Sequence, residues 1–141
     1  MVPKPKVVFD TNILISAIIF GGNPKTCLEL ARSGELELYT SKPLLLEFAQ
    51  KLKVKFKWDD QDINDVIEAI AKFAQITKPK LKITLIKKDP PDNRVLECAL
   101  EAKVDYIVSG DKKHILSLKK LKTIPTITAT EFLKIYYQSK K

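Results

Sequence analysis

Short apolar runs alternate along the chain with longer stretches in which apolar residues recur every three or four positions. The short runs are rich in β-branched and aromatic residues, a composition typical of buried parallel strands. The first run delivers Asp10 to the end of a strand, where open α/β sheets place their ligands. The apolar runs predict strands at residues 6–10, 36–39, 81–86, 104–108 and 126–128.

The longer stretches carry the start and stop signals of helices. The first helix is interrupted at the pair Gly21 and Gly22, and the next one has Asn23 as its cap, Pro24 at its first position and a stop at Gly34. Ser41 caps a helix that carries Glu47 in its second turn. Helices are predicted to begin near Asn12, Asn23, Ser41, Asp59, Asp92 and Thr128, the last with capping-box spacing to Glu131, and a short helix is expected around His114.

Residues 51–58 allow two interpretations. Lysines and apolar residues alternate strictly in KLKVKFKW, which favours a strand, whereas the position after an amphipathic stretch favours a helix tail with lysines that extend to solvent. We favour the helix tail.

This alternation of strands and helices predicts an α/β fold, with a mostly parallel central sheet covered by helices on both faces. The length of 141 residues fits one domain that spans residues 1–141. Parallel strands end at the same edge of such a sheet, so Asp10 and Asp111 should meet there. The helix starts that carry Glu47 and Asp92 should converge on the same edge.

Composition narrows the class of protein. The net charge of +8 fits a polyanionic partner, although solubility alone could explain it. No apolar run approaches the length of a membrane helix and no cleavable signal pattern opens the chain, so we expect a cytosolic protein without a membrane partner. Cys27 and Cys98 occupy helical apolar positions without CxxC spacing, which predicts reduced core thiols.

The four acids point to metal chemistry. Clustered carboxylates repel one another, so a set of four is costly unless cations neutralise it. Hard oxygen ligands select Mg²⁺ or Mn²⁺, and two such ions can activate a water and hold a phosphate between them. Each acid also has a simpler interpretation, since Asp92 could cap a helix and Asp111 could be a turn residue. The only histidine, His114, is interpreted as a surface or substrate-side residue.

Four segments together resemble the PIN domain family. They are Val-Val-Phe-Asp-Thr-Asn at residues 7–12, Glu47 on its helix, Asp-Pro-Pro-Asp-Asn-Arg at residues 89–94, and Tyr-Ile-Val-Ser-Gly-Asp at residues 106–111. The resemblance covers essentially the whole chain, and the turn at residues 89–93 is similar to the DPxDN subgroup. It implies a Rossmann-like three-layer α/β/α fold. By motif, it implies Asp10, Glu47, Asp92 and Asp111 as ligands of Mg²⁺ or Mn²⁺, supported by Asn12 and Ser109.

The resemblance also implies an activity. Many small members of the family are endoribonucleases and the toxin halves of toxin-antitoxin pairs, often as homodimers. We therefore expect a metal-dependent endoribonuclease that hydrolyses RNA, with a possible antitoxin partner and a homodimer or higher oligomer. Some members carry a further acid after the fourth, where this chain has lysines. The expected contacts to the RNA backbone are Lys112, Lys113 and His114, with Lys87 and Lys88 as further candidates.

Two other functions remain open from the sequence. The first is a non-catalytic RNA-binding or partner-regulated module that keeps the fold without needing metal. The second is a phosphotransferase of the haloacid dehalogenase type, which also begins with an apolar strand ending in aspartate. That family requires a second aspartate two residues later, where this chain has Asn12. Within the metal site, Asp89 could contribute through a shifted register, although the family pattern favours Asp92.

Overall fold

The structure is a computed structural model that describes residues 4–79, 90–110, 120–121 and 124–140. For residues 90–92 and 120–121 it describes the backbone alone. The strand predicted at residues 81–86 and the short helix predicted around His114 therefore lie outside the described residues.

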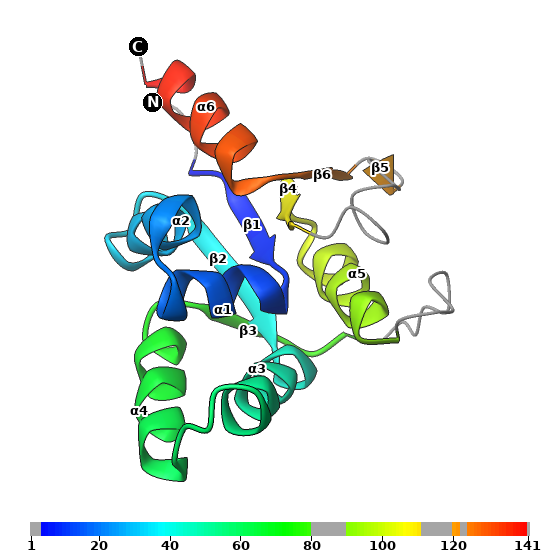
Figure 1. Ribbon diagram of the computed structural model, residues 1–141. Helices are drawn as coiled ribbons and strands as arrows, with labels where there is room; N and C mark the ends of the chain where they lie inside the picture. The colour runs from blue at the N-terminus through cyan, green and yellow to red at the C-terminus, as the bar shows by residue number, and fades with distance from the viewer. Residues whose placement is uncertain (1–3, 80–89, 111–119, 122–123, 141) are drawn as a thin grey trace.

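A six-stranded sheet forms the centre of the molecule, in the order β3-β2-β1-β4-β6-β5 (Figure 1). Every neighbouring pair is parallel except β5 and β6, so the predicted mostly parallel sheet is confirmed. The strands are β1 (Lys6–Phe9), β2 (Glu37–Ser41), β3 (Gln75–Thr77), β4 (Tyr106–Val108), β5 (Lys120–Leu121) and β6 (Ile124–Ile127).

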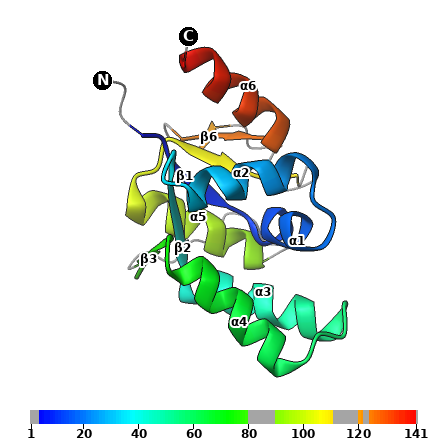
Figure 2. The same cartoon turned by 90° about the vertical axis from the view of Figure 1, so that its left-hand side faces the viewer.

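Helices cover both faces of this sheet, which confirms the three-layer α/β/α architecture (Figure 2). Side chains alternate along β1: Val7 and Phe9 join the larger core cluster with α1, α2 and α6, whereas Val8 joins the smaller cluster with α5. α3 contributes to both clusters. The helices are α1 (Thr11–Ile19), α2 (Gly22–Arg32), α3 (Lys42–Val54), α4 (Asp60–Ala71), α5 (Pro90–Ala102) and α6 (Ala129–Ser139).

The helix starts follow local capping chemistry. Ser41 caps α3 by accepting a hydrogen bond from the Leu44 N–H, and Asp59 caps α4 in the same way. Thr128 and Glu131 form both hydrogen bonds of a capping box at the start of α6. The caps at Ser41 and Thr128 and the helix start at Asp59 were predicted from the sequence, because each depends on residues no more than three positions apart.

The junction between α1 and α2 differs from the prediction. Gly21 is the N-cap of α2 and Gly22 its first residue, with φ angles of 83° and 69°. These left-handed conformations are easy for glycine and let the chain turn by 99° in two residues, so Pro24 is the third helical residue and the predicted cap at Asn23 is wrong. Among the described residues no single helix is long and apolar enough to cross a membrane, and α1 and α2 pass that test only when counted together.

Residues 51–58 form the end of a helix followed by a turn. α3 continues to Val54, which confirms the helical interpretation for its first half. Two short strands were not predicted: β3 is three residues long, and β5 has two. Strands this short carry too little periodicity to be distinguished from loop in a sequence.

Both cysteines are buried free thiols, as predicted. Burial raises the pKa of Cys27 to about 12 and that of Cys98 to about 11, the latter against an opposing hydrogen bond with Thr77. The thiols therefore stay protonated at neutral pH and behave as small apolar core residues.

Candidate functional site

The site begins where β1 and β4 end side by side. Phe9 is in register with Val108, and the Asp10 N–H donates to the Val108 carbonyl over 3.0 Å. The chain leaves β1 toward β2 on one side, while β4 lies on the other side. This is a topological switch point, and ligands of open parallel sheets bind there, outside the carboxyl ends of the strands.

Asp10 is held rigidly at this point. Its side chain is 3% exposed and caps α1, because Oδ1 accepts a hydrogen bond from the Ile13 N–H over 2.9 Å. Oδ2 accepts a hydrogen bond from the buried Ser109 hydroxyl, which follows β4. The positive end of the α1 dipole favours negative charge at the same place. Asp10 is thus a buried carboxyl group held at the strand ends by hydrogen bonds from Ile13 and Ser109.

Removing the Ser109 hydroxyl should test how far Asp10 depends on it. We expect Ser109→Ala to lower the free energy of unfolding by about 1–3 kcal/mol, because a buried carboxylate oxygen loses a donor. Urea unfolding followed by circular dichroism measures the change. Ser33→Ala is a suitable control, since the exposed Ser33 hydroxyl donates to a carbonyl at a helix end and should matter much less. Equal stability of Ser109→Ala and the wild type would contradict the role of the hydroxyl.

Glu47 lies on α3 and is linked to the start of α1 through Lys51. The Lys51 Nζ is 3.2 Å from Glu47 Oε1, one helical turn away, and donates to Asn12 Oδ1 over 2.9 Å. Asn12 is two residues beyond Asp10 in the first turn of α1. The structure therefore joins Glu47 and Asn12 around one ammonium group, and joins Asp10 to Ser109.

The other predicted site residues are described in part or not at all. Asp92 is the third residue of α5, consistent with the predicted helix start, but its side chain is outside the description. Where side chains are described, no group of three or more His, Cys, Asp or Glu could hold a metal ion. The convergence of all four acids stays a prediction. Also outside the described residues lie Asp111, Lys112, Lys113, His114, Asp89, Lys87 and Lys88.

The described part of the site fits a hard divalent cation. Asp10, Asn12 and Glu47 offer carboxylate and amide oxygens, the ligand types that Mg²⁺ and Mn²⁺ prefer. A cation already occupies part of this arrangement, because the Lys51 ammonium lies between Glu47 and Asn12. The donor set is thus suited to positive charge.

Two charged residues whose contacts the structure shows, Glu97 and Lys51, were not singled out from the sequence. Glu97 on α5 is 6% exposed, and its carboxylate is 2.8 Å from the Arg94 guanidinium one turn earlier. The available signal was an acid at a core position, directly between Leu96 and Cys98. The alternating pattern of residues 51–58 does not distinguish Lys51 from its neighbouring lysines, because its contact with Asn12 spans 39 positions.

Comparisons with known proteins agree with this architecture. The uncharacterized protein MJ1680 of Methanocaldococcus jannaschii is 32% identical over 122 residues, which cover 82% of this chain and 76% of the relative. VapBC2 from Rickettsia felis, solved bound to a DNA fragment from its promoter, superposes with a TM-score of 0.61 at 16% identity, covering 86% of this chain and 96% of that chain. The T. brucei RRP44 PIN domain superposes with a TM-score of 0.54 at 10% identity, covering 97% of this chain and 83% of that chain.

The likeness to the two solved structures shows the fold alone, because their sequence identity to this chain is too low to show more. The sequence itself carries the family assignment, because a PIN domain model matches residues 6–113, well over half of the chain. The chain belongs to the PIN domain family.

Proposed function

We propose that this protein is a divalent-metal-dependent endoribonuclease of the cytosol that hydrolyses RNA phosphodiester bonds. The observation that carries the proposal is the buried Asp10 carboxylate at the switch point between β1 and β4, fixed by Ser109 and by the start of α1. A carboxylate in this position is poised to hold a cation at the place where the fold binds ligands. Membership of the PIN domain family supports a nuclease.

In this proposal the acids hold the metal and the basic residues hold the RNA. Bound Mg²⁺ or Mn²⁺ supplies the charge that lowers the pKa of a water and stabilises the developing charge on the phosphate. Asn12 and Ser109 keep the ligands oriented by hydrogen bonding. The proposed ligands are Asp10, Glu47, Asp92 and Asp111, and the proposed RNA contacts are Lys112, Lys113 and His114.

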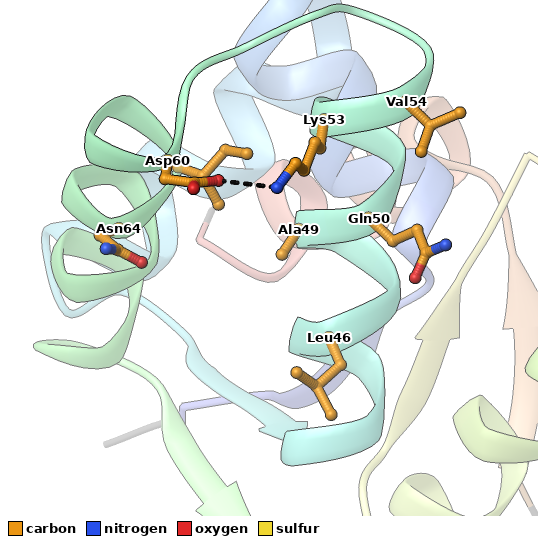
Figure 3. A pocket seen from close by; sticks show the side chains of 8 residues that line it. Leu46, Ala49, Gln50, Lys53, Val54, Asp60 and Asn64 are labelled. Carbon is orange, nitrogen blue, oxygen red and sulfur yellow. Dashed lines mark hydrogen bonds and ion pairs between the residues drawn. The ribbon is translucent and has the colours of Figure 1, made fainter.

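We also propose that the protein is the toxin of a toxin-antitoxin pair and forms a homodimer or higher oligomer. The support is the likeness of its fold to a solved VapBC2 complex. A cleft of about 520 Å³ between α3 and α4 offers surface to a protein partner (Figure 3). Leu46 and Val54 line it and are 60% and 58% exposed.

The competing function is an RNA-binding module without catalysis, and dependence on metal separates the two. Purified protein is incubated with a structured RNA of mixed sequence in Mg²⁺, in Mn²⁺ or in EDTA. We expect discrete cleavage products with either metal and none with EDTA, since the carboxylates do no hydrolysis alone. RNA that is bound equally in all three conditions and never cut would overturn the nuclease proposal in favour of the binding module.

A further inference from the structure

We propose that Lys51 is a resident counter-cation of the metal site, whose ammonium group holds Glu47 and Asn12 until a divalent ion displaces it. The inference rests on the proposed function, since it concerns the same site. Its consequence is a threshold: the protein takes up metal only at concentrations high enough to compete with its own lysine.

The geometry of Lys51 sets it apart from an ordinary surface lysine. Its Nζ bridges two elements, with Glu47 Oε1 at 3.2 Å on α3 and Asn12 Oδ1 at 2.9 Å on α1. The Lys51 and Glu47 side chains are 31% and 20% exposed. Both acceptors are oxygens of residues proposed to hold or support the metal. The ammonium therefore occupies a position with oxygen ligands on two sides.

Lys53 on the same helix provides the contrast. Its Nζ is 3.1 Å from Asp60 Oδ1 across the cleft between α3 and α4 (Figure 3). These two side chains are 64% and 77% exposed, so solvent and salt screen the pair. Lys51 and Lys53 thus share a helix and a charge, but Lys51 alone of these two faces the oxygens at the start of α1.

Electrostatics links Lys51 to metal uptake. A positive charge beside a carboxylate satisfies part of its demand for a cation, and like charges repel. A divalent ion that reaches Glu47 must therefore break the ion pair or bind beside an ammonium. Either way the affinity for metal is lower than that of the same carboxylates without the lysine.

The test measures Mn²⁺ binding in the absence of RNA. The concentration of free Mn²⁺ is monitored by electron paramagnetic resonance. We expect Lys51→Met, which keeps most of the aliphatic stem, to bind Mn²⁺ about tenfold more tightly than the wild type, because the ammonium group no longer repels the ion or competes for Glu47. Lys51→Arg keeps the charge and should stay close to the wild type. Lys53→Met is the matched control and should leave the affinity unchanged. Thermal unfolding of each variant verifies that it is folded, and Lys51→Gln replaces the methionine variant if that one is not.

The outcomes separate the inference from the proposed function. Unchanged or weaker Mn²⁺ binding by Lys51→Met, together with metal-dependent RNA cleavage by the wild type, overturns the counter-cation and leaves the nuclease. Tighter binding by Lys51→Met, together with no cleavage under any condition, supports the counter-cation and overturns the nuclease. Absence of Mn²⁺ binding in every variant overturns both.

Discussion

Asp10→Asn is expected to lower metal-dependent RNA cleavage by at least about 100-fold, a loss at or above the range found for residues that only support metal ligands. The amide removes the negative charge that a cation needs. Asparagine is also a good N-cap, so its oxygen can still accept from the Ile13 N–H and α1 should keep its start. Initial cleavage rates in Mn²⁺ measure the effect, and Mn²⁺ affinity should fall with them.

Asp65→Asn is the control for this change. Asp65 lies exposed on α4, where it accepts a hydrogen bond from Gln61, and no site residue contacts it in the described part of the chain. It loses the same unit of charge and should cleave RNA like the wild type. If Asp10→Asn and Asp65→Asn had equal activity, Asp10 would not be part of the reacting site.

Among the proposed variants, Phe48→Ala should lower the free energy of unfolding the most. The Phe48 ring is fully buried in the larger core cluster, and its truncation removes buried apolar surface and leaves a cavity. Changes of this kind cost about 3–5 kcal/mol, a large share of the stability of a domain this size. We expect the midpoint of urea unfolding to fall accordingly, or the protein to be only partly folded at 37 °C.

Leu46→Ala tests whether burial, rather than side-chain size, causes that loss. Leu46 is two residues away on the same helix and is 60% exposed, so its truncation should change the free energy of unfolding by less than about 0.5 kcal/mol. A similar loss in both variants would contradict the assignment of Phe48 to the core. Phe48 directly follows Glu47, so the same burial holds the segment of α3 that presents the Glu47 carboxylate.

The buried strand and most helix caps around the site were predicted from the sequence. The run before Asp10 predicted a buried strand because its β-branched and aromatic residues suit a strand covered on both faces, and Val7, Val8 and Phe9 are indeed almost fully buried. The caps at Ser41 and Thr128 were predictable for a related reason, since a cap joins a side chain to a backbone N–H two or three positions away. The predicted start of α2 at Asn23 was wrong, because two successive glycines adopt left-handed conformations and the helix begins before Asn23.

The sequence by itself determined the longer strands and the helices of the described residues, the family, and the placement of Asp10 at the end of a strand, because each rests on patterns within short segments of the chain. The short strands β3 and β5 were not predicted. Tertiary structure alone decided that the Ser109 hydroxyl, 99 positions away, donates to Asp10. It also decided that Lys51, rather than Lys53, joins Glu47 to Asn12, although both lysines belong to the same alternating run. The physical reason is that these contacts follow from how helices pack across the sheet, and side-chain hydrogen bonds over such separations leave no periodic signal in the chain.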